Sequence, residues 1–273
     1  MPCSRSIALA AVFFALLPAA ALAGPIQDNS FLLEEAYNQE PGVIQHISAF
    51  NRSSEAGAWV YSFTEEWPIR GQTHQGSVTF NFADLGAMNG RGVGDVLLNY
   101  RWQAVGSGET PVAFAPRLTA VLPTGDSDRG LGGGGAGIEV NLPLSVELGE
   151  HFVSHVNLGG RYVPSAKGVA GKARYGSFTA GQSFIWLAHQ NLNFMVETVY
   201  SSSERWTDAS GERTESLTIN PGIRAALNLG GLQVVPGLAF PMGIGPSQGS
   251  AAVFFYLSFE HPFQPAGPLS DGK

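Results

Sequence analysis

Strict alternation over residues 137–149 is the feature that most constrains how this chain can fold. In the stretch GIEVNLPLSVELG, apolar side chains occupy every second position: Ile138, Val140, Leu142, Leu144, Val146 and Leu148. The positions between them hold Glu139, Asn141, Pro143, Ser145 and Glu147. Because a strand points successive side chains to opposite faces, one face of this segment is apolar and the other is polar. Such a strand suits either a soluble sandwich, with its apolar face on a core, or an outer-membrane barrel, with its apolar face on lipid.

The N-terminus has the layout of an exported chain. Arg5 precedes an apolar run over residues 7–17, and the small residues Ala21 and Ala23 follow it. This pattern predicts a signal peptide over residues 1–23, because the apolar run is too short to cross about 30 Å of hydrocarbon. Cleavage removes Cys3, the only cysteine. An exported chain without cysteine holds no disulfide, so a small disulfide-stabilised scaffold is excluded.

Charge and composition exclude further classes of protein. Without Arg5 the chain carries 14 basic and 22 acidic residues, a net charge of −8, which makes it a poor binder of nucleic acid. Charged residues make up only 14% of the sequence, against about 25% in a typical soluble domain. Since no later run of 18 apolar residues exists, helical membrane spans are also excluded. A membrane protein built from strands reconciles export with low charge.

Twelve segments share the alternation, and clusters of Gly, Ser, Asn, Asp and Pro between them predict turns. The segments are residues 43–52, 57–67, 77–85, 92–104, 111–123, 137–149, 151–163, 175–187, 192–200, 217–231, 232–241 and 252–263. Their lengths suit the roughly 9 to 11 tilted residues that cross a bilayer better than the roughly 5 or 6 of an ordinary strand. Two residues break the pattern, since Gln182 falls on an apolar face and Met195 on a polar one.

We therefore predict an all-β fold, a transmembrane antiparallel up-and-down β-barrel of about 12 strands over residues 43–263. Short connections alternate with longer ones along the chain, as in barrels with short periplasmic turns and longer outer loops. An even number of strands leaves both ends in the periplasm. Residues 24–42 are then expected to form an N-terminal periplasmic segment, and residues 264–273 a C-terminal tail. The expected location is the outer membrane of a Gram-negative cell.

The polar faces of the strands supply the candidate binding residues, which we expect to line the lumen. They are Asp95, Arg101, Arg117, Glu139, Glu147, Arg161, Glu197 and Arg224, with the large Phe254 and Tyr256 of the last strand. Opposite charges in one lumen can pair and so avoid the cost of lone desolvated ions. They can equally guide a solute, because charges in the lumen tune selectivity. Twelve strands enclose less room than a water-filled porin, which predicts a narrow or plugged lumen.

No motif in the sequence predicts catalysis, a metal ion or a cofactor. The loop DRGLGGGGAG lacks the Gly-Lys-Ser/Thr and the helix of a phosphate-binding loop, so we expect a flexible outer loop. Asp126 and Asp128 within it fall short of the roughly 6 to 8 oxygens that calcium prefers. His46 and Ser48 share one face of a strand, as in an outer-membrane phospholipase, but no third residue that would orient the histidine can be identified.

Three stretches in order, GVGDVLLNYRWQ, APRLTAVLPTGD and GLGGGGAGIEVNLPLS, precede NPGIRAALNLGG and a closing aromatic strand. With them, roughly residues 58–263 resemble the transporter-like outer-membrane proteins named for a role in the meta-pathway degradation of phenol. The resemblance implies passage of aromatic or other hydrophobic compounds across the outer membrane. Its motifs are strand and turn patterns without catalytic residues, so they indicate the fold more strongly than they indicate the substrate. One departure is the tail QPAGPLSDGK after Phe263, because barrels of this kind end on an aromatic residue.

The leading hypothesis is a porin-like channel or transporter, without a cofactor, for uptake of small hydrophobic or aromatic compounds. Its expected partners are outer-membrane lipid, the solute and the barrel assembly machinery that inserts it, with no nucleic acid. Two alternatives remain. One is a structural or adhesive surface barrel without transport, and the other is an outer-membrane lipid hydrolase.

Overall fold

A computed structural model describes residues 26, 28–54, 57–86, 90–168, 171–207 and 211–263. The predicted signal peptide and the tail after Phe263 lie outside these residues. The described strands are β1 Val43–Ser53, β2 Trp59–Arg70, β3 His74–Asp84, β4 Arg91–Val93, β5 Val96–Trp102, β6 Val112–Phe114, β7 Arg117–Leu122, β8 Gly137–Glu147, β9 Phe152–Gly168, β10 Gly171–His189, β11 Leu192–Trp206, β12 Gly211–Ala225, β13 Leu227–Leu229, β14 Leu232–Ala239, β15 Met242–Ile244 and β16 Ala252–Pro262. Two short 3-10 helices, η1 Ser127–Arg129 and η2 Gly245–Ser247, lie in loops.

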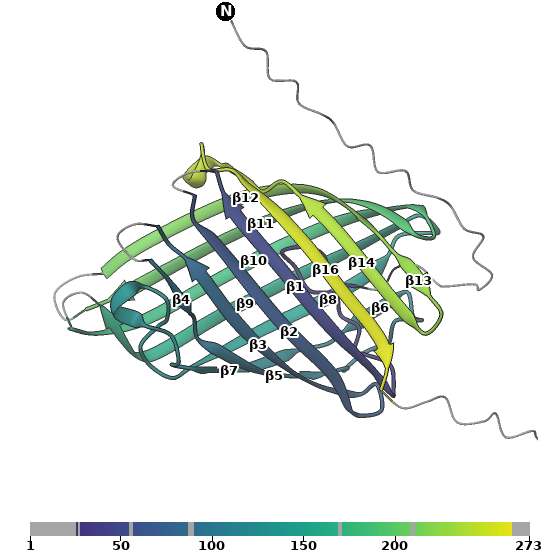
Figure 1. The fold of residues 1–273 in the computed structure, drawn as a ribbon, viewed down its shortest axis with the longest axis horizontal. Coiled ribbons are helices and arrows are strands. Elements are labelled where there is room, and N and C mark those ends of the chain that lie inside the picture. Colours follow the sequence, from purple (N-terminus) through teal and green to yellow (C-terminus); the bar gives the residue numbers. More distant parts are fainter. Residues whose placement is uncertain are drawn as a thin grey trace, which may run out of the picture.

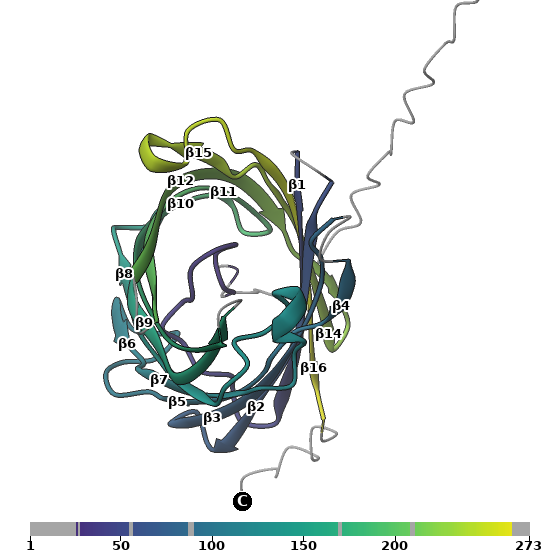
Figure 2. The same cartoon turned by 90° about the vertical axis from the view of Figure 1, so that its left-hand side faces the viewer.

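The strands close into one antiparallel barrel, seen from the side in Figure 1 and nearly end-on in Figure 2. Twelve strands form the wall of the barrel, and we call them staves. Around the wall they follow in the order β1, β2, β3, β5, β7, β8, β9, β10, β11, β12, β14 and β16, and β16 pairs with β1. The four remaining short strands continue staves that are interrupted, as β6 leads into β7 across Pro116 and β14 into β15 across Pro241. Proline has no N–H to donate to the ladder, which fits the gap in strand pairing at these two points. The predicted barrel of about 12 strands is confirmed.

Apolar side chains cover the outside of the wall, as the alternation predicts. In β8, for example, the outward Ile138 is 57% exposed and the outward Leu142 38%. Ser145, at an inward position of the same strand, is fully buried. Leu158 and Leu227 are exposed in the same way on other staves. Gln182 also faces outward, where its amide donates a hydrogen bond to the Ser154 hydroxyl at 3.1 Å. A band of exposed apolar side chains around the whole wall is what lipid, and not water, stabilises.

The two ends of the barrel differ in their connections. At one end the turns are short, and Gly149 and Gly230 adopt positive φ angles of 75° and 65° that favour glycine. β1 begins and β16 ends at this same end, where Val43 pairs with Pro262. Several strands extend beyond the predicted segments at the other end; β10 and β11 pair as far as Arg174 and Trp206. These extensions carry polar side chains without alternation, so periodicity could not reveal them.

The largest departure from expectation concerns the segment before β1. We expected residues 24–42 to lie in the periplasm, but residues 28–39 are inside the barrel, each of them buried or half-buried. Figure 2 shows this purple trace within the ring of strands. Phe31 and Ile26 join Ile185, Met195 and Phe254, from three staves, in an apolar cluster inside the lumen. Residues 28–39, which we call the plug, give Met195 the apolar partners that a water-filled lumen would have denied it.

Candidate functional site

The plug is held in the lumen by side chains of the wall that bind its backbone. Glu197 on β11 accepts the N–H groups of Leu32 and Leu33 at 2.8 and 3.1 Å. Asn157 on β9 accepts the Glu34 N–H at 3.0 Å and donates to the Glu34 carbonyl at 2.7 Å. Further backbone contacts come from the side chains of Gln75, Arg101, Gln103 and Ser145. An extended segment buried in a lumen needs such partners, because its backbone groups have no ladder of their own.

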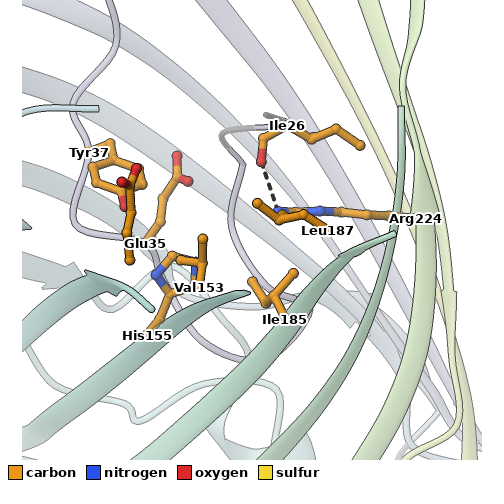
Figure 3. A pocket seen from close by; sticks show the side chains of 9 residues that line it. Ile26, Glu35, Tyr37, Val153, His155, Ile185, Leu187 and Arg224 are labelled. Carbon is orange, nitrogen blue, oxygen red and sulfur yellow. Dashed lines mark hydrogen bonds between the residues drawn. The ribbon is translucent and has the colours of Figure 1, made fainter. Parts of the chain in front are cut away.

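Asp28 and Arg224 fix the beginning of the plug. The Asp28 carboxylate accepts hydrogen bonds from the hydroxyls of Tyr256 and Ser258, both at 2.5 Å. Arg224 on β12 donates to the carbonyls of Asp28 and Asn29 at 2.6 Å, and to that of Ile26 at 3.1 Å, the contact dashed in Figure 3. Burial raises the pKa of Asp28, while the positive charge of Arg224 acts in the opposite direction.

Inward-facing glycines make room for the plug's apolar side chains. The Phe31 ring lies against the inner face of β12 and β14. A Cβ added at Gly222 would meet the ring at 2.3 Å, and one added at Gly237 would meet it at 2.4 Å. The same ring contacts Phe254 and Tyr256, with centroids 5.8 and 5.9 Å apart. On β10, a Cβ at Gly181 would meet Leu33 at 2.7 Å. These strand glycines mark places where another part of the chain approaches closely, which is one of the few uses of glycine inside a strand.

A chain of charges links the plug to the wall. Glu34 of the plug lies 2.8 Å from Arg117, which also pairs with Glu139 at 2.8 Å. Glu139 in turn pairs with Arg161 at 2.6 Å. Arg101 on β5 lies 3.3 Å from Glu66 on β2, across the intervening strand β3. These six charges are therefore paired, which offsets the cost of removing them from bulk water.

A small cavity beside the plug, of about 20 Å³, is drawn in Figure 3. Glu35 and Tyr37 of the plug border it, together with His155 and Arg224 of the wall. The buried Glu35 Oε2 has no hydrogen-bond partner among the described residues. Burial raises the pKa of Glu35 well above its ordinary value, and the negative charge of Asp28 raises it further. Glu35 therefore holds a proton more tightly while the plug is docked than after its release.

A larger cavity, of about 400 Å³, lies beyond the plug towards the long loops. Apolar and aromatic residues form much of its lining, and Arg161 and Arg205 also border it. A third cavity, of about 190 Å³, adjoins the plug, and Arg161 borders both this cavity and the larger one. The apolar members of the larger cavity are Val60, Phe82, Leu85, Leu97, Val121, Leu131, Val163 and Tyr175.

The glycine-rich loop after β7 forms part of that lining, where we had expected a flexible outer loop. Asp95 accepts the N–H groups of Gly125 and Gly133 at 3.0 and 2.8 Å and so holds the loop against the wall. A Cβ at Gly132 would lie 2.5 Å from the Asp95 carboxylate, which explains the glycine. Asp126 caps η1 by accepting the Asp128 N–H at 3.1 Å. The loop is a structural element of the outer cavity.

All ten candidate residues lie on the inner side of the wall, although most of them meet the plug or each other. Arg101, Arg117, Glu197, Arg224, Phe254 and Tyr256 contact the plug; Glu139 and Arg161 pair; Asp95 holds the glycine-rich loop; and Glu147 borders the small cavity. The sequence did not single out the neutral partners Gln45, Gln75, Gln103, Ser145, Asn157 and Ser258. Polar residues are expected on any luminal face, so alternation could not mark these as plug-binding.

The pair considered for lipid hydrolysis is not assembled. The Ser48 hydroxyl lies 3.1 Å from the Tyr61 hydroxyl, and His46 Nε2 lies 3.2 Å from His261 Nε2. Within the described ranges no group of three or more His, Cys, Asp or Glu side chains could hold a metal ion. Nor does any helix in that part of the chain have the length and apolarity to cross a membrane.

Comparison with solved structures places the fold. The chain is similar to an outer-membrane channel from Pseudomonas putida F1, with a TM-score of 0.62 and 13% identity over 83% of this chain and 97% of that one. It is also similar to the NanC porin, with a TM-score of 0.54 and 7% identity over 79% of this chain and 98% of the porin. No protein-family model and no curated protein sequence matches the chain. Similarity at this low identity establishes the fold, a transmembrane barrel of the outer-membrane type.

Proposed function

We propose that this protein is an outer-membrane channel that the plug keeps closed until it is displaced. The observation that carries the proposal is how the plug is bound. Its backbone hydrogen bonds run to side chains of the wall, such as Glu197 and Asn157, and none of residues 28–39 belongs to a strand. Releasing the plug therefore leaves every ladder of the barrel intact, and water entering the lumen can satisfy the freed side chains.

The solute class that the cavities fit best is a small aromatic or otherwise apolar compound with a negative group. The outer cavity offers the ring of Tyr175 and the inward side chains of Val121 and Val163 to an apolar body. Arg205 at its border would attract a carboxylate, because guanidinium groups bind carboxylates well. The resemblance to transporter-like proteins of phenol degradation supports the same class. Residence in lipid and insertion by the barrel assembly machinery belong to this proposal.

Planar-bilayer recording and cellular uptake together test the function. We expect low conductance from the full-length protein and a clearly larger, stable conductance after deletion of residues 28–39. Heat-modifiable migration on gels checks that the deleted protein still folds. Cells with the gene should take up a labelled aromatic acid faster than cells without it.

The alternative is a surface barrel that transports nothing and is only braced by its plug. Folded protein without residues 28–39 that conducts no more than the parent would favour this alternative. Equal uptake of the aromatic acid with and without the gene, combined with large conductance after deletion, would leave the channel and reject the solute class.

A further inference from the structure

Two histidines meet on the outer face of the seam that closes the barrel. β1 and β16, the first and last strands, pair so that Ile44 lies opposite His261 and His46 opposite Phe259. Gln45 and Ile47, on either side of His46, are buried in the lumen, so His46 points outward. Both histidines lie near the end of the barrel with the short turns. They are 215 positions apart in the sequence, so no spacing rule could have paired them.

The other ring nitrogen of each histidine faces an oxygen atom. His46 Nδ1 lies 3.9 Å from the Glu65 carboxylate, and His261 Nδ1 lies 3.1 Å from the Pro262 carbonyl oxygen. The Pro262 carbonyl oxygen is an acceptor, so His261 Nδ1 carries the hydrogen of its neutral ring and His261 Nε2 presents a lone pair. The two Nε2 atoms are 3.2 Å apart. His46 Nε2 either donates an N–H···N hydrogen bond to that lone pair or, with its own hydrogen on Nδ1 beside Glu65, presents a second lone pair to a shared cation.

We propose that His46 and His261 bind a divalent transition-metal ion, such as Zn²⁺, across the seam between β1 and β16. Zinc–nitrogen bonds are about 2.0–2.1 Å long. With the nitrogens 3.2 Å apart, such bonds subtend an angle of about 100° at the metal, close to the tetrahedral arrangement that zinc prefers. Imidazole is a ligand that zinc, copper and nickel share.

Glu65 acts as the orienting partner of this site. Metal-bound histidines commonly donate their second N–H to a carboxylate, which fixes the ring and strengthens the ligand. The Phe63 ring stacks on His46, with centroids 6.3 Å apart and planes 14° from parallel, and limits its rotation. His46 keeps 28% of its side-chain surface exposed, so water can fill the remaining positions of the metal. A metal held this way ties the first strand of the barrel to the last.

Titration of the untagged, full-length protein in detergent with Zn²⁺ at pH 8 tests the site, because few histidines carry an extra proton there. Calorimetry should show one saturable site per chain, and Zn²⁺ should raise the temperature at which the barrel unfolds on gels. His46→Gln and His261→Gln should each abolish both effects. Glu65→Ala should weaken binding by about 10–100-fold.

His189→Gln is the matched control, since His189 is an exposed histidine at the same end of the barrel. This variant should bind Zn²⁺ like the parent. Absence of a one-to-one site in the parent would overturn the proposal and leave a shared proton between the two rings. Retention of binding in both His46→Gln and His261→Gln would overturn it as well, because the metal would then sit elsewhere.

Discussion

Glu197 offers the sharpest test of how the plug is held. Its fully buried carboxylate accepts the N–H groups of Leu32 and Leu33, and also the Asn220 amide at 2.6 Å. Glu197→Ala leaves two backbone donors of the docked plug without a partner, at a cost of about 1–3 kcal/mol each. The Asn220 contact is lost whether the plug is docked or released, so it does not affect the balance. Release should therefore become about 2–6 kcal/mol more favourable, which raises the released fraction roughly 30-fold to 10⁴-fold.

A single cysteine in the plug reports this release directly. The chain's only cysteine is Cys3, in the predicted signal peptide, so Ser30→Cys would give the mature protein one thiol. Ser30 is 1% exposed, and cysteine is close to it in size. A membrane-impermeant maleimide should label this thiol slowly in the parent and much faster together with Glu197→Ala. Bilayer conductance should rise in parallel.

Glu197→Gln serves as the control for this experiment. Its carbonyl oxygen can still accept the plug N–H groups, and its amide can donate to Asn220 Oδ1, which makes no hydrogen bond within the described residues. Labelling of this variant should stay close to the parent's rate. Labelling of Glu197→Ala at that same rate, in protein shown to be folded, would refute the idea that these hydrogen bonds hold the plug.

Three further predictions follow from the same structure. Gly237→Ala places a Cβ 2.4 Å from the Phe31 ring and should increase conductance, whereas Gly231→Ala, in an exposed turn, should not. The raised pKa of Glu35 means that docking takes up a proton. Plug binding is then strongest below the ordinary pKa of a glutamate, about 4.3, and weakens as the pH rises through the raised pKa of Glu35. Conductance should therefore increase with pH. The increase should be smaller in Glu35→Gln, which cannot titrate at this position. Leu142→Arg, on the lipid face, should cost about 2–4 kcal/mol of folding free energy near the bilayer midplane. Chemical denaturation of the protein folded in lipid vesicles measures this cost. No loss of stability would show that Leu142 does not face lipid.

The wall of the barrel could be predicted from the sequence because lipid imposes a strict pattern on it. Each stave must show apolar side chains on one face over the whole thickness of the bilayer, so in β8 Ile138, Val140 and Leu142 recur at every second position. Facing follows from the same period, which is why the ten candidate residues all lie inside. The strand extensions to Arg174 and Trp206 escaped prediction, because no lipid constrains their side chains.

The plug escaped prediction for a different reason, since an extended segment bound by side chains has no periodicity of its own. Several residues of the wall nevertheless indicate where the plug binds. Met195 breaks the alternation of β11 because it packs against the plug, and Gly181 and Gly237 leave room for Leu33 and Phe31. In a lumen filled with water, an inward Met gains nothing and inward glycines only weaken their strands. Apolar residues and glycines that gather on the luminal face of neighbouring strands therefore indicate a segment inside the barrel, and they do so from the sequence alone once the facing of each strand is known.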